Sequence, residues 1–258
     1  MRVGVAAVLF GVLAAALVVS GCGGNARTSE PPPPVTTTVA TTTTVTTAAA
    51  TTTAPSHEST ALRLYFLAPD GKLVAMSREV AQTQAPGGAA LHELLTPPDG
   101  MGTKVPDDLA LTISDGSAKV TGATLGGAAL AQVVYTLTSF PTVQSVNGRT
   151  RTDAEEFAPP ILVEQPSPDA TVTSPLHVTG SANTFEATFD YRLEDAAGKV
   201  LAKNFVTATS GSGTRGTFDF TVPFSIDVPQ DGALRVFELS AEDGSVVHER
   251  VIPLRLSR

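Results

Sequence analysis

The sequence predicts a small α+β domain, with a small sheet and helices, followed by an all-β antiparallel sandwich. Three observations support this fold class. Residues 61–153 mix alternating apolar runs with two helical patterns, whereas residues 159–258 contain alternating runs alone, and residues 22–60 are rich in Thr, Pro and Ala. Alternation with a period of two is typical of a half-buried strand, and apolar positions three to four residues apart are typical of a helix. The Thr- and Pro-rich segment cannot bury enough surface to fold, so it predicts a disordered stalk.

The first residues have the layout of an export signal. Met1-Arg2 precedes an uncharged apolar run from Val3 to Val19, which leads through Ser20-Gly21 to Cys22, the only cysteine. A run of about 17 apolar residues is at the short limit for crossing a bilayer, so an uncleaved anchor is the alternative reading. The tetrapeptide at 19–22 resembles the lipobox of bacterial lipoproteins, in which the cysteine is acylated. We therefore expect a lipoprotein signal peptide at residues 1–21 and a lipid anchor at Cys22.

The segment 22–60 is expected to be a disordered linker. It contains Pro31–Pro34 and several runs of Thr separated by Ala and Val. This composition is typical of an O-glycosylated stalk, and equally of an unmodified flexible spacer. In either case the linker would hold the folded part away from the membrane.

The predicted α+β domain begins with two hairpins. Residues 62–66 alternate apolar and polar positions, and the turn residues 69–72 lead into Leu73-Val74. A second alternating run at 109–113 is followed by the turn Asp115-Gly116 and a returning run. Between the hairpins, a short helix around Leu91, Leu94 and Leu95 is expected to end before Pro97-Pro98.

The strongest helical pattern follows the second hairpin. Leu130, Val133, Val134 and Leu137 recur at the spacing of one helix face, and Pro141 ends the run. We expect this helix to pack on the sheet through that face. Residues 142–146 are then predicted to form a closing strand.

Residues 61–148 resemble the sporulation and germination module GerMN. The matching residues are Leu64-Tyr65-Phe66, Gly71, Leu73-Val74, Arg78, Leu91, Leu94-Leu95, Val105-Pro106, Asp115-Gly116 and, above all, the stretch from Ala131 to Pro141. The resemblance implies an α+β fold and no known catalytic residues. We therefore assign residues 61–153 to a GerMN-like domain.

The segment 159–258 is predicted to be the sandwich. Residues 185–193 and 218–224 alternate aromatic or aliphatic with polar positions, and turn signals divide the segment into about seven short strands. No Trp and no second cysteine is available for an antibody-type core. Residues 161–256 resemble the Gmad2 family, an immunoglobulin-like module of bacterial envelope proteins. The matching residues are Pro166, Ser174-Pro175, Val178, Gly180, Phe185-Glu186-Ala187, Asp195, Gly198, Gly216, Phe218, Asp243-Gly244-Ser245 and Pro253.

The charge balance argues against nucleic acid as a partner. The chain has 17 Lys and Arg against 25 Asp and Glu, for a net charge of −8. Binding to a phosphate backbone needs a basic surface. An acidic surface also repels anionic lipid, so membrane attachment is expected through lipidated Cys22.

No catalytic, cofactor-binding or metal-binding residues are predicted. Gly211, Gly213 and Gly216 fit the pattern G-x-G-x-x-G, but the neighbours are sandwich strands and not the strand and helix that a dinucleotide site requires. The four histidines are spread along the chain without metal-ligand spacing. We therefore expect a protein that is not an enzyme and holds no cofactor.

One polar surface is a candidate recognition patch. If Phe185 and Phe237 face the core, then Glu186 and Glu238 project outward from separate strands, together with Arg192. The alternative is an ordinary solvated strand face with cross-strand ion pairs.

Together these observations predict a lipid-anchored protein on the extracytoplasmic face of the cell membrane. Its two modules would bind or scaffold an envelope protein or a cell-wall polymer. A peptidoglycan-acting hydrolase or hydrolase accessory is the alternative from another class, and a deep pocket with converging titratable groups would favour it. A solute-binding lipoprotein is a third reading, but two small dissimilar domains lack the two matched lobes of that class.

Overall fold

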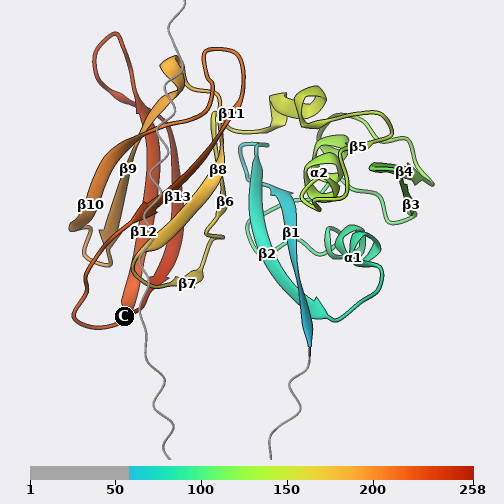
Figure 1. Ribbon diagram of the computed structural model, residues 1–258, viewed down its shortest axis with the longest axis horizontal. Helices are drawn as coiled ribbons and strands as arrows, with labels where there is room; N and C mark the ends of the chain where they lie inside the picture. The colour runs from blue at the N-terminus through green and yellow to red at the C-terminus, as the bar shows by residue number, and fades with distance from the viewer. Residues whose placement is uncertain (1–57) are drawn as a thin grey trace, which may run out of the picture. The chain divides into compact units, whose positions relative to one another are not determined.

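The computed structural model describes residues 58–258, which form an N-terminal and a C-terminal module (Figure 1). The predicted signal peptide, Cys22 and nearly all of the predicted linker at 22–60 lie outside the described residues. Among residues 58–258, no helix is both long enough and apolar enough to cross a membrane.

The N-terminal module is the predicted α+β fold. Its elements in chain order are β1 (Ser59–Leu67), β2 (Leu73–Ala81), α1 (Pro86–Glu93), β3 (Ala110–Ser114), β4 (Ser117–Thr121), α2 (Gly127–Leu137), β5 (Ser145–Val146) and the short 3₁₀ helix η1 (Arg151–Phe157). Strands β1 and β2 form one antiparallel hairpin, and β3, β4 and β5 form a second small sheet. Both predicted hairpins are confirmed, each with its turn where Gly71 or Gly116 has a positive φ. The predicted closing strand is only two residues long and pairs parallel with β4.

Strand β1 is buried on both faces. Leu62, Leu64 and Phe66 pack with α1 and α2 in one apolar core, as their alternation predicts. Tyr65 and Leu67, which point the other way, are also buried, in a second cluster that includes Leu162 of the next module. The face of β1 that the alternation predicts to contact solvent is therefore covered, because the β1–β2 hairpin lies between the helices and the C-terminal module.

Helix α2 also packs on two sides. Val133, Val134 and Leu137 join the first core, which confirms the predicted apolar face. Ala131 and Tyr135 join the second cluster on the other side. The helix therefore lies at the centre of the N-terminal module and connects its two apolar clusters.

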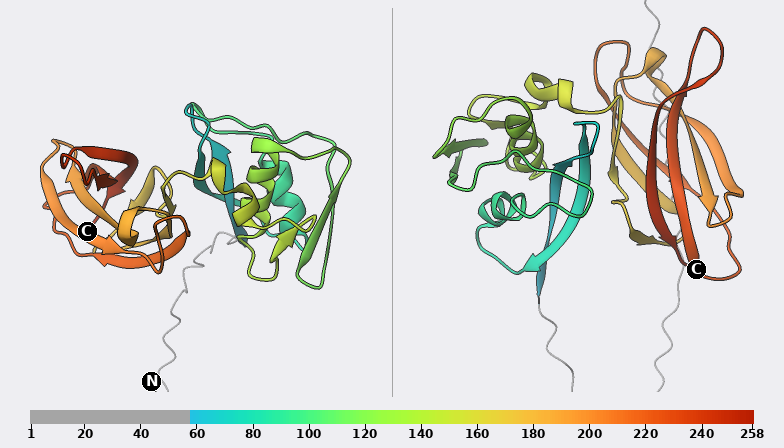
Figure 2. Two further views of the ribbon diagram at one scale, coloured as in Figure 1. Left: turned by 90° about the horizontal axis from the view of Figure 1, so that it is seen from above. Right: turned by 180° about the vertical axis from the view of Figure 1, so that it is seen from behind.

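The C-terminal module is a sandwich of two facing sheets, seen from further angles in Figure 2. Its strands are β6 (Ile161–Gln165), β7 (Ala170–Val172), β8 (Leu176–Ala182), β9 (Thr188–Asp195), β10 (Val200–Thr207), β11 (Gly216–Val222), β12 (Gln230–Leu239) and β13 (Val246–Leu256). One sheet has the order β10-β9-β12-β13-β7 and the other β11-β8-β6. The sandwich is thus confirmed, with eight strands, and β7 pairs parallel with β13. Side chains from both sheets, including Phe189, Phe218 and Leu234, form its core.

The alternating run that begins at Phe185 differs from the prediction. Strand β9 starts only at Thr188, and Phe185–Ala187 form a single tight turn, η2, in which Glu186 and Ala187 have positive φ values of 53° and 59°. Phe185 is 64% exposed. Its expected position facing the core was wrong, because the chain reverses direction at these residues before the strand begins.

Candidate binding groove

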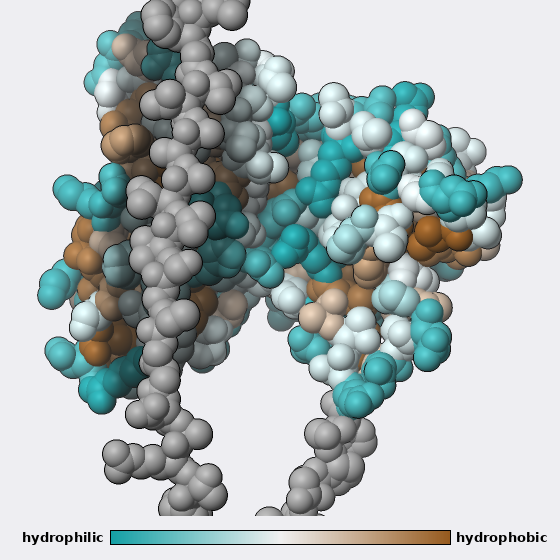
Figure 3. Space-filling model, viewed as in Figure 1, coloured by the Kyte–Doolittle hydropathy of each residue, from teal (hydrophilic) through white to brown (hydrophobic). Residues whose placement is uncertain are grey.

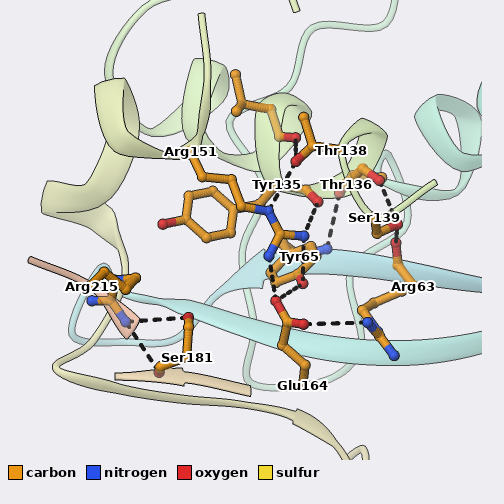
Figure 4. Close-up of polar contacts among 11 residues, drawn as sticks. Arg63, Tyr65, Tyr135, Thr136, Thr138, Ser139, Arg151, Glu164, Ser181 and Arg215 are labelled. Atoms are coloured by element: carbon orange, nitrogen blue, oxygen red, sulfur yellow. Dashed lines mark hydrogen bonds and ion pairs between the residues drawn. The ribbon is translucent and has the colours of Figure 1, made fainter. Parts of the chain in front are cut away.

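Glu164 is the charged residue of β6, and it accepts hydrogen bonds from three side chains. Tyr65 Oη donates to Glu164 Oε1 at 2.5 Å, Arg151 Nη1 donates to the same oxygen at 2.6 Å, and Arg63 Nη1 donates to Oε2 at 3.3 Å (Figure 4). The Glu164 side chain is only 13% exposed. We call these four residues, Glu164, Arg63, Tyr65 and Arg151, the clamp, because they connect the N-terminal module to the first strand of the sandwich.

Arg151 begins η1 and has partners for all its donor groups. Its Nε donates to Thr138 Oγ1 at 2.9 Å, and its Nη2 donates to the main-chain oxygen of Tyr135 at 3.2 Å. The guanidinium also lies over the rings of Tyr65 and Tyr135, with distances of 5.4 and 4.9 Å to the ring centroids. Such stacking favours arginine over lysine. Arg151 therefore fixes η1 against α2 and β1 at the point where the chain leaves the N-terminal module.

The surroundings of the clamp raise the pKa of its phenol, Tyr65. Burial raises the pKa of Tyr65 well above its usual range, and the nearby charge of Glu164 raises it further, more than the two arginines lower it. Burial likewise raises the pKa of Tyr135. Tyr65 therefore stays protonated and acts as a hydrogen-bond donor to Glu164 rather than as a base.

A further ion pair connects the two modules, and a hydrogen bond ties the β1–β2 turn to η1. Arg250 of β13 pairs with Asp70 of the β1–β2 turn at 2.7 Å. Lys72 Nζ donates to the main-chain oxygen of Glu156 at 2.6 Å. Partial burial acts to raise the pKa of Asp70, but the main-chain N–H of Lys72 and the guanidinium of Arg250 outweigh it and hold the pKa below its usual value.

A groove of about 650 Å³ lies beside the clamp. Strand β1, Ser77 of β2 and residues 139–141, which follow α2, line one side, and the segment from Glu164 to His177 lines the other. The residues that offer hydrogen bonds there are Ser77, Ser139, Ser167, Thr171, Thr173 and His177. The face shown in Figure 3 is covered mainly by hydrophilic residues where the two modules meet. The volume falls within the usual range of ligand sites, and the lining mixes these polar groups with apolar side chains such as Leu62, Phe140 and Leu176, which suits an extended chain that carries both polar and apolar groups.

Two of the histidines lie within hydrogen-bond distance of a carboxylate. His177 Nε2 lies 2.6 Å from Asp219 Oδ1 on neighbouring strands, with both side chains more than half exposed. His248 Nδ1 lies 2.5 Å from Glu238 Oε2. Across residues 58–258, no group of three or more His, Cys, Asp or Glu side chains is placed to hold a metal ion.

The three residues of the predicted recognition patch have different surroundings. Glu238 is 8% exposed and accepts a hydrogen bond from the main-chain N–H of Phe185 at 2.9 Å. Glu186 lies in the turn η2, where its main-chain N–H donates to Ser212. Arg192 lies on the outer face of its sheet, with its guanidinium 4.6 Å from the ring centroid of Phe237. Phe237 is therefore covered by Arg192 on that outer face and does not face the core as expected.

Of the glycines in the G-x-G-x-x-G pattern, Gly211 and Gly213 lie in the loop between β10 and β11, and Gly216 is the first residue of β11. A Cβ at Gly211 would be 2.4 Å from the nitrogen of Ala187, and one at Gly216 would be 2.2 Å from the nitrogen of Ser210. Two of the three glycines therefore permit close backbone packing within the sandwich, which accounts for them without a nucleotide.

Sequence reasoning did not identify the clamp. Its one visible signal is a glutamate inside the apolar strand 161–163, since a charge at such a position needs a partner. The partners Tyr65 and Arg151 are 99 and 13 residues away in sequence. Only the structure shows that they meet.

Comparisons with known proteins give one match for each module. Residues 63–147 match the family model Germane, described as sporulation and spore germination, and residues 160–245 match Gmad2, described as the immunoglobulin-like domain of bacterial spore germination. No curated protein matches the chain.

Two solved structures show weak similarity. The tandem GerMN domains of the sporulation protein GerM from Bacillus subtilis are 15% identical, with a TM-score of 0.33; the match covers 66% of this chain and 63% of that one. CopC from Methylosinus trichosporium OB3b is 17% identical with a TM-score of 0.25, over 38% of this chain and 93% of that one. The assignment depends on the two family models and on the fold. The chain therefore contains a Germane sporulation and spore germination module followed by a Gmad2 immunoglobulin-like module.

Proposed function

We propose that the protein is a lipid-anchored envelope protein whose two modules act together as a non-catalytic binding unit. Its partner would be another envelope protein or a cell-wall polymer. The observation that carries this proposal is the groove beside the clamp, which is lined by hydroxyl and apolar side chains from both modules. A lining of this kind binds an extended chain along its length.

The chemistry of the clamp favours a positioning role over catalysis. Glu164 already accepts from three donors, and each of the three nitrogens of Arg151 already donates a hydrogen bond. A general acid or base needs an available proton or lone pair near its substrate. The clamp instead holds the two walls of the groove at a fixed separation.

The anchor gives the binding unit its location. Acylation of Cys22 would attach the chain to the outer face of the cell membrane, and the linker 22–60 would hold the modules above it. One acyl chain binds a bilayer only marginally, whereas two or more hold a protein durably.

Replacement Cys22→Ala should release the protein from the membrane fraction. If the variant remained in the membrane after its signal had been cleaved, the anchor assignment would be wrong.

Site-specific crosslinking in cells tests the binding role. A photoreactive amino acid at Thr173, in the groove, should give one or a few adducts of defined mass. The same amino acid at Thr121, an exposed threonine of β4 outside the groove, is the matched control. Adducts from Thr173 alone are expected. An absence of adducts at Thr173, or the same set from both positions, would count against the groove as the binding site.

A second function has one specific observation in its favour. His177 lies on the groove with Asp219 at 2.6 Å, which is the arrangement that orients a histidine as a base in a hydrolase. Incubation of purified peptidoglycan with the protein tests this alternative. Release of soluble fragments that is lost in His177→Ala would establish the hydrolase and overturn the non-catalytic proposal.

A further inference from the structure

A second hollow lies on the outer face of the five-stranded sheet, and it shares no lining residue with the groove. Its volume is about 530 Å³, and strands β9, β10, β12 and β13 line it. The side chains that matter for binding there are Arg192, Lys203, Phe205, Phe237, Leu239 and Val246. We call this site the outer hollow.

Cationic residues form a row across the sheet beside the outer hollow. Lys203 of β10 is paired in register with Arg192 of β9, which is paired in turn with Arg235 of β12. Like charges on directly opposite positions destabilise a sheet. Arg235 is compensated by Glu194 at 2.7 Å and Glu249 at 3.2 Å. Within residues 58–258, neither Arg192 nor Lys203 has an ion-pair partner, although Asp190 also lines the hollow.

The Arg192 side chain is held in place by stacking, but its Nε has no hydrogen-bond partner in the described structure. Its guanidinium stacks on Phe237 at 4.6 Å, and its Nε is buried without a hydrogen-bond partner in the described structure. Stacking fixes the plane of the guanidinium and leaves its outer nitrogens for an acceptor from outside. Two nitrogens in one plane match the two oxygens of a carboxylate.

Apolar side chains lie beside this cationic row. Phe205 is 64% exposed, Leu239 51% and Val246 45%, and all three line the outer hollow. Lys203 and Phe205 are two residues apart on β10, so they lie on the same face of the strand. A bound extended segment would meet a positive charge and an apolar surface at that same two-residue spacing.

We propose that the outer hollow binds an acidic segment of a partner protein, in which a carboxylate side chain lies two residues from an apolar one. The carboxylate would pair with Arg192 and Lys203, and the apolar side chain would cover Phe205 and Leu239. This goes beyond the groove proposed above. The outer hollow prefers a negatively charged partner, although the whole chain has a net charge of −8. That net charge and the concave shape favour a protruding peptide over an anionic bilayer.

Binding of short defined peptides to the detergent-solubilised full chain tests the proposal. The probe is the N-acetylated, C-amidated pentapeptide Ser-Glu-Ser-Phe-Ser, and its control has Gln in place of Glu. We expect the Kd of the Glu peptide to be about tenfold lower, as a charge-assisted hydrogen bond implies. NMR signals of Arg192 and Phe205 should shift on binding.

Three charge variants and two phenylalanine variants locate the site. Arg192→Gln should raise the Kd of the Glu peptide about tenfold, and Lys203→Gln, at an exposed position, should raise it by a smaller factor. Lys199→Gln removes the same charge outside the hollow and should change nothing. Phe205→Ser should weaken binding, whereas Phe185→Ser, at an equally exposed phenylalanine elsewhere, should not.

Several results would overturn the proposal. One is equal affinity for the Glu and Gln peptides, and another is unchanged affinity in both Arg192→Gln and Lys203→Gln. If Arg192→Gln abolished binding to anionic phospholipid vesicles while peptide binding persisted, the surface would be a membrane contact. If it instead converted a dimer to a monomer, the occupant would be a second copy of the chain.

Discussion

Glu164 is the residue through which strand β6 of the sandwich binds the N-terminal module. A carboxylate with 13% exposure is expensive to desolvate, and its three donors compensate for that cost. Each partner also depends on it, since Tyr65 Oη and Arg151 Nη1 are held by the same oxygen. Loss of the charge would therefore leave buried donors without a strong acceptor.

Replacement Glu164→Gln is expected to destabilise the protein by about 3 kcal/mol, because it breaks a buried ion pair and leaves Arg151 uncompensated. Chemical denaturation gives the change in free energy of unfolding. The control is Glu156→Gln at an exposed position on η1, which should change stability by no more than about 0.5 kcal/mol. Equal effects from the two variants would show that the clamp is not a stabilising contact.

All three tyrosines should ionise at a higher pH than a tyrosine in the unfolded chain. Burial raises the pKa of Tyr65, Tyr135 and Tyr191, in the case of Tyr65 with help from Glu164. A tyrosine whose pKa is higher in the folded than in the unfolded protein stabilises the fold fully at pH values below its pKa in the unfolded chain, about 10. That stabilisation is lost as the pH rises toward its pKa in the folded protein.

Tyrosinate absorbance and unfolding, followed together as the pH is raised, check this prediction. At a pH of about 11 Tyr65 should remain protonated in the native protein and ionise only on unfolding. Tyr65→Phe should remove part of the alkaline loss of stability. Ionisation of all three phenols near pH 10 with the fold intact would contradict the buried clamp.

At the scale of elements, most strands and both α-helices could be predicted from the sequence. Their apolar side chains repeat at the period of the element, as in residues 62–66 and 130–137. The prediction failed at Phe185, where a continuing alternation of apolar and polar residues hides a reversal of the chain. It also failed to show that Tyr65 is buried, because burial on that face depends on the neighbouring module and not on β1 itself.

Gly180 in β8 marks a place where two strands and a ring approach closely. A Cβ there would be 2.1 Å from the main-chain oxygen of Leu162 and 2.5 Å from Phe218 Cζ. Gly180→Ala should therefore destabilise the sandwich by about 1–3 kcal/mol through overpacking. Gly88→Ala in α1 meets no atom within 4 Å and should stabilise by about 0.5 kcal/mol, since alanine favours a helix. Thermal unfolding of both variants tests the pair, and a neutral Gly180→Ala would contradict the close packing.

At the scale of the whole molecule, the junction between the modules was beyond sequence reasoning. Both families could be recognised from local residues, but the clamp joins side chains as far apart in the sequence as Tyr65 and Glu164, and the pair Asp70–Arg250 is further apart still. The spacing of apolar residues within a module predicts its helices and strands but not contacts between such distant residues. The surroundings of Glu238 and Arg192 in the candidate patch were also beyond sequence reasoning, since they depend on strand pairing and on the turn at Phe185.

The two modules are proposed to form one fixed binding unit with the groove between them. Residual dipolar couplings measured on the full chain test it most directly, because they report the orientation of each module in a common frame. We predict that couplings from residues 63–147 and 160–245 fit a single alignment tensor, and that Glu164→Gln makes the two sets diverge. Two independent tensors in the unmodified protein would contradict the claim.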